Sequence, residues 1–314
     1  MEKQKKVRIL VTGGAGFVGS AMVEKLSLDP NNRITVVDNL QTGDINKIPV
    51  SPNVKFIKCD VNDFREISSV FHAGRFHYVF HYAALVGVQR TLKNPVKVLE
   101  DIRGIENILM LSKNTGVQHV FYSSSSEVYG EPVEFPQNEH TTPLNSRLPY
   151  AIVKNVGEAY LRSYQREYNL NFTIFRFFNT FGPKQSKDFV ISRFINMALQ
   201  NRPISIYGDG SQTRTFCFVE DNIDACYRAF KDKLFVNDVV NIGGNIETTI
   251  LELATLVKEL TGSQSEIRHL SALKEGDMTR RLPDVSKMQE LLQRKPLTLE
   301  EGIKRVLADT KFIV

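Results

Sequence analysis

The sequence contains few cysteines and no long apolar run. Only three of its 314 residues are cysteines, and their wide spacing fits neither a disulfide framework nor a zinc motif: Cys59, Cys217 and Cys226. We therefore expect structural thiols and no metal site. No segment approaches the roughly 18 apolar residues of a membrane span, and the basic start MEKQKK leads into VRILVTG, not into a signal peptide's apolar core. These absences predict a soluble, cytoplasmic protein with no membrane partner.

Concentrated charge and low-complexity linkers are also missing. The 40 basic and 35 acidic residues give a formal net charge of +5, which is spread along the chain except for the short basic cluster at its start. This distribution argues against a nucleic-acid partner and allows an anionic small substrate. With 42% hydrophobic residues and no repeats, the chain has the composition of a globular protein with a large core.

Strand-like apolar runs alternate with helical patterns over the first 180 residues. The runs lie at 7–13, 33–39, 54–61, 78–84, 119–125 and 172–179, and segments such as 63–74 and 96–113 are helical in pattern. This alternation predicts an α/β fold with a doubly wound parallel sheet of the Rossmann type. Helical segments at 191–200 and 248–262 alternate with short strands further on. We therefore divide the chain into a Rossmann domain at 1–180 and a smaller α/β region at 181–314.

The first apolar run ends in a glycine turn, VTGGAGFVG. Gly13, Gly16 and Gly19 have the spacing of a dinucleotide-binding turn, which needs glycine for a tight bend, for approach to pyrophosphate and for helix packing. A glycine turn can also end a strand for structural reasons alone. Here the turn follows a strand, opens a helix and precedes Asp38 by about 20 residues. A carboxylate there binds the ribose 2′-hydroxyl and repels a 2′-phosphate, so the sequence predicts NAD as the cofactor instead of NADP.

A second pattern with catalytic potential is the pair Tyr150 and Lys154, four residues apart and therefore on one face of a helix. A tyrosine with a pKa of about 10 is a weak base, but a neighbouring ammonium and a charged nicotinamide both favour the phenolate. An isolated pair would more often be plain helix packing. In this chain the pair follows SSSSEVYG, at a strand end where open parallel sheets bind ligands.

Nine motifs in order resemble the extended short-chain dehydrogenase/reductase superfamily, in its nucleotide-sugar epimerase, dehydratase and decarboxylase branch. They are TGGAGFVG, VVDN, CDV, HYAA, SSSSEVYG, YAIVK, RFFNTFGPKQ, IYGDGSQTR and RRLPDVSK, and they cover nearly the whole chain. The resemblance implies a nucleotide-diphosphate sugar as substrate, held mainly by residues 181–314. It also implies NAD-dependent hydride transfer at the sugar C4, and a role in making surface polysaccharide sugars.

The resemblance also implies roles for particular residues. It identifies Ser125 as the catalytic hydroxyl, Tyr150 as the base, and Lys154 as its partner, which also binds the nicotinamide ribose. The expected NAD contacts, besides Tyr150 and Lys154, are Gly13, Gly16, Phe17, Val18, Gly19, Asp38, Asn39, Asp60, Val61, Ala83 and Ala84. Asp60 has an alternative structural role as a helix cap. The expected substrate contacts are Ser126, Asn179, Arg214 and Arg281.

The residues leave the net reaction open. The segments HYAALVGVQRTLKNP and LPYAIVK resemble those of 4-epimerases, whereas TRTFCFVEDNIDA, RRLPDVSK and the pair Ser126-Glu127 resemble those of UDP-glucuronate decarboxylases. A family member that stops at the ketone and acts as a net C4 dehydrogenase is also allowed. A 4,6-dehydratase would also use Glu127, with a second acid in place of Ser126. On a strand, Glu127 would share a face with Ser125 and act beside the sugar C5; otherwise it caps a turn or is solvated. Asp101 stands where most relatives have asparagine.

Three further expectations concern function class and assembly. A non-catalytic NAD-sensing regulator could use the same fold, since fold alone does not define activity. Ser125, Tyr150 and Lys154 together argue against it. A reductase of a free small carbonyl compound would not need Asn179 or Arg214. The resemblance implies a homodimer formed through helices at about 96–114 and 150–167, although an apolar stripe there fits core packing equally well.

Overall fold

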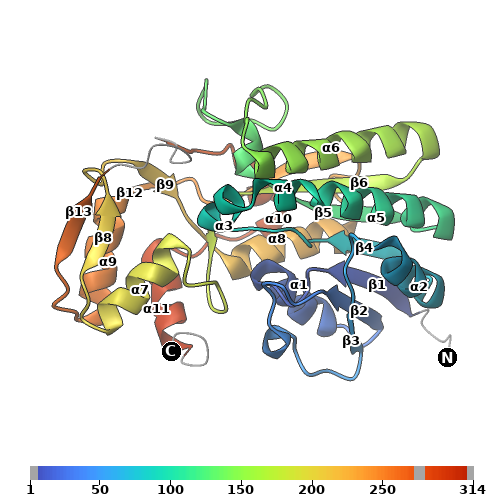
Figure 1. The fold of residues 1–314 in the computed structure, drawn as a ribbon, viewed down its shortest axis with the longest axis horizontal. Helices are drawn as coiled ribbons and strands as arrows, with labels where there is room; N and C mark the ends of the chain where they lie inside the picture. Colours follow the sequence, from blue (N-terminus) through green and yellow to red (C-terminus); the bar gives the residue numbers. More distant parts are fainter. Residues whose placement is uncertain (1–5, 272–279, 310–314) are drawn as a thin grey trace.

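A seven-stranded parallel sheet forms the centre of the molecule (Figure 1). The computed structural model describes residues 6–271 and 280–309. The strand order is β11-β6-β5-β4-β1-β2-β3, which is the doubly wound Rossmann order extended by one strand. The strands are β1 (Val7–Thr12), β2 (Asn32–Asp38), β3 (Val54–Lys58), β4 (Tyr78–His81), β5 (His119–Ser125), β6 (Asn171–Phe177) and β11 (Asp238–Ile242). The first six strands confirm the six expected from the sequence.

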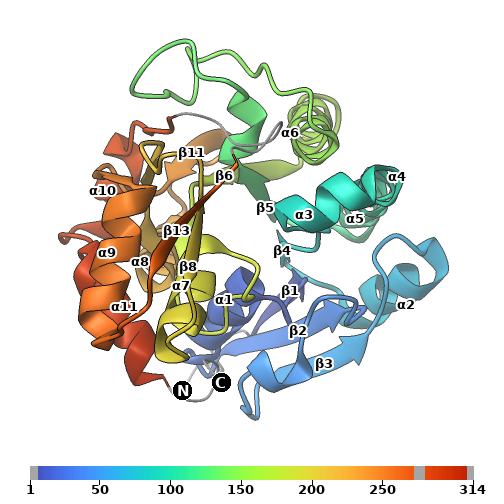
Figure 2. The ribbon, with the colours of Figure 1, turned by 60° about the vertical axis from the view of Figure 1, so that its left-hand side comes forward.

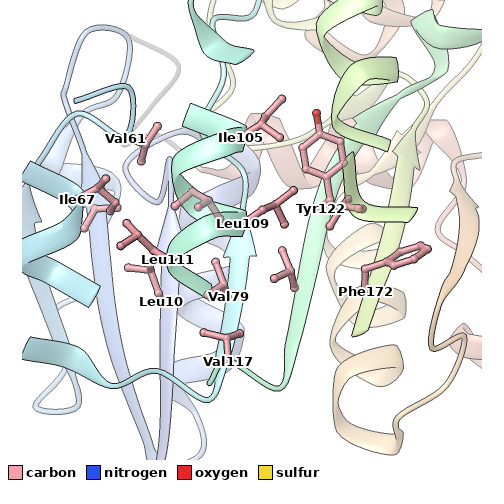
Figure 3. Close-up of a cluster of buried hydrophobic side chains, with 14 of the residues drawn as sticks. Leu10, Val61, Ile67, Val79, Ile105, Leu109, Leu111, Val117, Tyr122 and Phe172 are labelled. Carbon is pink, nitrogen blue, oxygen red and sulfur yellow. The ribbon is translucent and has the colours of Figure 1, made fainter. Parts of the chain in front are cut away.

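Helices cover both faces of this sheet because its strands are apolar on both sides. One face packs against α2 (Phe64–Gly74), α5 (Asp101–Thr115) and α6 (Pro149–Tyr168). Figure 3 shows part of this layer, where Leu109 and Ile105 of α5 lie over Val79 and Tyr122 of the sheet. The other face packs against α1 (Phe17–Ser27), α8 (Val219–Asp232) and α10 (Ser286–Leu292).

The remaining elements form a smaller body beside the sheet, on the left in Figure 1. Its core lies between α7 (Val190–Leu199), α9 (Ile250–Thr261) and α11 (Leu299–Ala308). Three two-stranded sheets accompany these helices: β7 (Thr180–Phe181) with β10 (Cys217–Phe218), β8 (Ile204–Tyr207) with β13 (Ile267–Leu270), and β9 (Thr213–Thr215) with β12 (Glu247–Thr249). Short helices α3 (Val88–Lys93) and α4 (Pro95–Leu99) precede α5, and single turns η1 (Ile45–Lys47) and η2 (Ser126–Tyr129) complete the elements.

The central sheet crosses the boundary that the sequence suggests at residue 180. β11 pairs in parallel with β6, from Asp238 beside Thr173 to Ile242 beside Phe177. In addition, α8 and α10 cover the sheet face shared with α1 (Figure 2). The chain therefore leaves the Rossmann body, enters the smaller body and returns, so a single cut at 180 does not separate the two. Among the described helices, none is long and apolar enough to cross a membrane.

Candidate active site

A cavity of about 560 Å³ runs along the carboxyl ends of the parallel strands. Parallel sheets bind ligands at this edge, because the loops that leave the strands diverge there. Of the site residues expected from the sequence, all except Lys154 and Arg214 line this cavity. The glycine turn and the β2 end contribute to the same cavity as the β5 end and the start of α6. One continuous space therefore connects the expected cofactor residues with the expected catalytic residues.

The glycine turn after β1 is built so that side chains cannot fill it. Gly13 has a φ of +67°, and a Cβ on it would lie 2.6 Å from the backbone nitrogen of Ala83. A Cβ on Gly19 would lie 2.2 Å from the Gly13 carbonyl oxygen, since the first turn of α1 packs directly on the loop. Gly16 is the N-terminal cap residue of α1. The turn thus presents bare backbone and a helix N-terminus to the cavity, which suits the pyrophosphate of a dinucleotide.

Asp38 ends β2 with both carboxylate oxygens directed by backbone amides. Its Oδ2 accepts a hydrogen bond from the Ala15 N–H at 3.0 Å, and its Oδ1 accepts one from the Leu40 N–H at 2.8 Å. Burial raises the pKa of this carboxyl, and the two backbone hydrogen bonds oppose that rise. Each oxygen keeps a lone pair for a ribose hydroxyl. The residue therefore fits the cofactor NAD without a 2′-phosphate.

Asp60 takes part in a hydrogen-bonded group and does not cap a helix. The Nδ2 of Asn39 donates to its Oδ2 at 3.0 Å, and the N–H of Asn62 donates to its Oδ1 at 2.9 Å. Asp63, not Asp60, is the N-cap of α2, accepting from the N–H groups of Arg65 and Glu66. The helix-cap alternative for Asp60 is thus wrong.

Ser125, Tyr150 and Lys154 meet where β5 ends and α6 begins. Tyr150 and Lys154 lie one turn apart on α6, as predicted, with the Lys154 Nζ 5.7 Å from the Tyr150 ring centroid. The Ser125 hydroxyl hydrogen-bonds with the Tyr150 phenol and lowers its pKa. Lys154 is buried, and its Nζ donates to the Ser123 carbonyl oxygen at 2.6 Å. Strand and helix thus hold a hydroxyl, a phenol and an amine in one cluster.

The protein's own groups raise the pKa of Tyr150. Burial is the largest cause, the charge of Glu127 raises it further, and the hydrogen bond with Ser125 opposes both. Among the protein's own groups, loss of water around the phenol outweighs the opposing hydrogen bond, and the favourable effect of the Lys154 ammonium together with a charged nicotinamide stays a prediction. Burial also lowers the pKa of Lys154 to about 8, against the charge of Asp101.

Glu127 does not lie on a strand. β5 ends at Ser125, and residues 126–129 form the 3₁₀ turn η2, so the two-residue alternation that predicted a shared face does not apply. The Glu127 N–H instead donates to the Ser125 Oγ at 3.2 Å. Both side chains still line the cavity, because the tight turn keeps them together.

The Glu127 side chain is mostly buried, and it pairs with a cation instead of capping the turn. Its Oε2 lies 2.9 Å from the Nη2 of Arg281, an ion pair without hydrogen-bond alignment. The Nη1 of Arg281 donates to the Ser126 Oγ at 2.9 Å. Backbone hydrogen bonds hold the segment that follows Arg281 in place. The Gln137 N–H donates to the Leu282 carbonyl oxygen at 2.7 Å, and the Gln137 carbonyl oxygen accepts from the Asp284 N–H at 2.8 Å. A buried guanidinium thus stands beside the proposed reacting end.

The other expected substrate residues lie at different distances from the cavity. Asn179 lines it and donates through Nδ2 to the Thr215 carbonyl at 3.0 Å. Arg214 lies on β9, where its Nη1 donates to the Thr213 carbonyl at 2.7 Å, and it does not line the cavity. Arg280 forms a two-bond ion pair with Glu247. The structure therefore brings Asn179 and Arg281 to the cavity, and leaves Arg214 outside its lining.

A buried ion pair beneath the site is absent from the sequence-based expectations. Glu158, one turn after Lys154, accepts from the Ser124 Oγ at 2.6 Å and from the Nε and Nη2 of Arg176 at 2.9 and 2.6 Å. Arg176 also donates to the Tyr129 hydroxyl at 2.8 Å. This group ties α6 to β5, β6 and η2. The four-residue spacing of Glu158 from Lys154 indicates that both lie on one helix face. Nothing in the local sequence indicates that Arg176 on β6 is the partner of Glu158.

A single cavity that joins the glycine turn to the Ser125–Tyr150 pair is typical of dinucleotide-dependent enzymes of the Rossmann class. Residues 9–243 match the model of the NAD dependent epimerase/dehydratase family. The chain belongs to this family, and it is an NAD-dependent enzyme.

Three similar proteins illustrate the range of this family. A putative UDP-glucose 4-epimerase of Methanocaldococcus jannaschii is 36% identical over 95% of this chain and 97% of that protein. UDP-glucuronic acid decarboxylase 1 of Danio rerio is 35% identical over 98% of this chain and 73% of its own length. The crystal structure of a UDP-glucose 4-epimerase from Thermotoga maritima with UDP-glucose superimposes with a TM-score of 0.89, at 34% identity, covering 96% of this chain and 97% of that one.

Proposed function

We propose that this enzyme oxidises C4 of a nucleotide-diphosphate sugar, with Tyr150 as the base for the C4 hydroxyl. The observation that carries the proposal is the continuous cavity, which joins the dinucleotide turn to Ser125 and Tyr150. NAD, when bound, accepts the hydride that leaves C4. Family membership together with the assembled Ser125, Tyr150 and Lys154 favours an enzyme over a regulatory protein.

The three catalytic residues divide the handling of the proton. Tyr150 takes the proton of the sugar hydroxyl, and Ser125, which hydrogen-bonds with the phenol, bridges the hydroxyl and the phenol. Lys154 supplies a positive charge within 5.7 Å of the Tyr150 ring. Because burial and Glu127 raise the pKa of Tyr150, the positive charges of Lys154 and of a bound nicotinamide are needed before the phenol can act as a base.

Binding energy from remote parts of the substrate would hold the sugar in place. We assign this role to Asn179, Ser126 and Arg281 in the cavity, and to Arg214 on β9 for the diphosphate. A guanidinium suits phosphate or carboxylate because it can donate two parallel hydrogen bonds. We also assign the expected NAD contacts to the glycine turn, Asp38 and the other cofactor-facing residues of the cavity.

For the net reaction we propose 4-epimerisation, in which the hydride returns to the other face of a 4-keto sugar. The similarity to proteins named UDP-glucose 4-epimerase supports this outcome. A net C4 dehydrogenase differs only in releasing the ketone and the reduced cofactor. Either reaction would serve the synthesis of sugars for surface polysaccharides.

A second candidate is decarboxylation of a UDP-hexuronic acid. The ion pair of Glu127 with Arg281 favours it, because a buried guanidinium at the reacting end can bind a sugar carboxylate. Once C4 is a ketone, a carboxylate on C5 stands β to it and can leave as carbon dioxide. A 4,6-dehydratase would instead use Glu127 to remove the C5 proton. The similarity to UDP-glucuronic acid decarboxylases supports decarboxylation more strongly than dehydration.

Incubation of the purified enzyme with UDP-glucose, UDP-N-acetylglucosamine and UDP-glucuronic acid separates these outcomes. NMR of the products should show a C4 epimer from one of the first two sugars. Release of carbon dioxide from UDP-glucuronic acid would instead identify the enzyme as a decarboxylase. Formation of NADH without either product would favour the net dehydrogenase, and no reaction of any sugar would contradict the proposed function.

A homodimer through α5 and α6 remains part of the proposal. These helices lie side by side on one surface of the molecule (Figure 1). Exposed apolar side chains occur on both α6 and the adjoining α4. Tyr168 at the end of α6 is 47% exposed, and Val96 on α4 is 74% exposed. Burial of such side chains favours association. Sedimentation of the purified protein should give the mass of a dimer.

A further inference from the structure

The segment from Lys184 to Phe189 joins β7 to α7 and borders the cavity. Its Gln185 and Phe189 line the cavity together with the glycine turn and Tyr150. Charged side chains near both ends of the segment bind the Rossmann body, one at Lys184 and one at Asp188. The segment is therefore held at two separate points beside the cavity.

Lys184 attaches the first end to the cofactor side of the cavity. Its Nζ donates to the Glu24 Oε2 on α1 at 3.0 Å and to the Lys47 carbonyl oxygen on η1 at 3.4 Å. The glycine turn leads into α1, and η1 follows the loop whose Gln41 and Thr42 line the cavity. The lysine side chain is only 19% exposed. One lysine thus connects the segment with two walls of the expected cofactor site.

Asp188 attaches the other end to α3, which follows β4. Its Oδ2 accepts from the Arg90 Nη2 at 3.1 Å, and the Arg90 Nη1 also donates to the carbonyl oxygen of Val86, which lines the cavity, at 2.9 Å. Figure 2 shows α3 beside α4 and α5, whereas α1 covers the other face of the sheet. The two attachments therefore reach helices that belong to opposite faces of the sheet.

The attachments stand on either side of the point where β4 lies next to β1. The strand order reverses at this point, since β2 and β3 follow β1 in one direction and β5 and β6 follow β4 in the other. A doubly wound sheet binds its dinucleotide in the crevice at such a reversal. The segment consequently lies across the crevice that the expected NAD contacts line.

We propose that residues 184–189 form a strap that closes the cofactor crevice, and that its two attachments must open before NAD can enter or leave. The inference rests on the NAD site of the family and not on the proposed sugar chemistry. Both attachments are contacts within the protein, so they close the strap with or without the nucleotide. A strap that is closed in both states slows binding and release to the same extent.

The backbone at Lys184 supports this role. Its φ of +70° lies in the left-handed region, which disfavours every side chain and favours glycine. The bonds from the lysine to Glu24 and to the Lys47 carbonyl offset this unfavourable conformation. If the attachments only stabilised the fold, their loss would lower the Tm and leave the rates of nucleotide exchange unchanged. Exposed ion pairs contribute little to stability, so we expect the opposite pattern.

Stopped-flow fluorescence with NADH tests the strap. Mixing nucleotide-free protein with NADH gives the association rate, and displacement of bound NADH by excess NAD gives the release rate. Removal of either attachment, by Lys184→Met or Arg90→Met, should raise both rates about three- to five-fold, and the double variant should raise them about ten-fold or more. The Kd for NADH should stay within about twofold of wild type.

Lys187→Met is the matched control, because it removes the same charge from an exposed residue of the same segment. Its rates should equal those of wild type. Unchanged rates in the double variant would overturn the strap. Faster release without faster association would identify a direct nucleotide contact and would overturn it as well. If Lys184→Met does not fold, Glu24→Gln removes the partner of the lysine and takes its place.

Salt provides a second readout that needs no substitution in the cofactor site. Raising NaCl from about 0.05 to 0.5 M screens exposed ion pairs, so NADH release should accelerate more in wild type than in the double variant. An equal response to salt in the two proteins would contradict the role of the ion pairs. If the protein oxidises no sugar, the proposed function fails, and the NADH rates still decide the strap.

Discussion

Arg281 places its Nη2 2.9 Å from the Oε2 of Glu127 and joins two distant parts of the chain at the cavity. The contact gives the glutamate a charged partner that a turn cap or a solvated residue would lack. It also leaves a nearly buried guanidinium beside Ser126, where a sugar substituent would lie under the proposed function. Glu127 and Arg281 are therefore the residues we expect to decide the fate of the 4-keto sugar.

Glu127→Gln should leave C4 oxidation in a single turnover at least as fast as in wild type, because loss of the charge removes one cause of the raised Tyr150 pKa. The later steps should change, with a different product ratio or a slower turnover. NADH absorbance reports the first step, and NMR of the products reports the rest. Glu131→Gln, an exposed residue further along the same loop, is the control. An unchanged product and turnover would show that Glu127 has no part in the reaction.

Asp38→Ala should narrow the preference of the enzyme for NAD over NADP. The carboxylate that would hydrogen-bond a ribose hydroxyl would also repel a 2′-phosphate, so its removal weakens NAD binding and relieves the repulsion. Isothermal titration of both cofactors measures the difference. Tighter binding of NADP than of NAD by the wild type would contradict the assignment of Asp38.

Hydride transfer should rise with pH up to about pH 8 and then level off. The rise follows ionisation of the Tyr150 phenol, whose pKa is raised by burial, and above about pH 8 the loss of the Lys154 ammonium, whose pKa burial lowers to about 8, offsets the further gain in phenolate. In Lys154→Met the rate should be lower but should keep rising above about pH 8, and NAD binding should be weaker. Single-turnover rates across pH provide the test, and a profile that still levels off near pH 8 in Lys154→Met would assign that change to another group.

Glu158→Ala should destabilise the fold strongly. It leaves the buried Arg176 guanidinium without its charge partner, and breaking a buried pair in this way costs about 3–5 kcal/mol. Urea unfolding measures the change. The control is Glu300→Ala, which breaks the exposed pair with Lys304 and should cost less than about 1 kcal/mol. Similar losses in both variants would show that the Glu158 pair does not support the site.

Local patterns predicted the fold up to β6 because most strands there alternate with a helix in the sequence, β2 and β3 being joined by the single turn η1 instead. The glycine turn at Gly13 and the one-turn spacing of Tyr150 and Lys154 are likewise local, and the structure confirms their conformations. β11 could not be assigned to the same sheet from the sequence, since it pairs with β6 although the elements from β7 to α8 lie between them in the chain. Sequence periodicity does not show which distant strands pair.

The site residues that sequence reasoning missed depend on contacts between distant segments. Glu158 and Arg176 each look like ordinary charged residues until α6 and β6 bring them to 2.6 Å. Glu127 was assigned a strand geometry because SSSSEVYG continues an apolar strand, whereas the chain turns immediately after Ser125. The partner of Glu127 lies beyond residue 180, so the pairing required the complete fold.

Tyr150→Phe in a single turnover tests the central claim most directly. Enzyme with bound NAD is mixed with the nucleotide sugar that it converts, unlabelled or deuterated at C4, and NADH absorbance is followed. We predict that wild type forms NADH more slowly from the deuterated sugar, and that Tyr150→Phe binds cofactor and sugar but loses about 100-fold or more of this rate. NADH formation without an isotope effect, or a near-normal rate in Tyr150→Phe, would contradict oxidation at C4 with Tyr150 as the base.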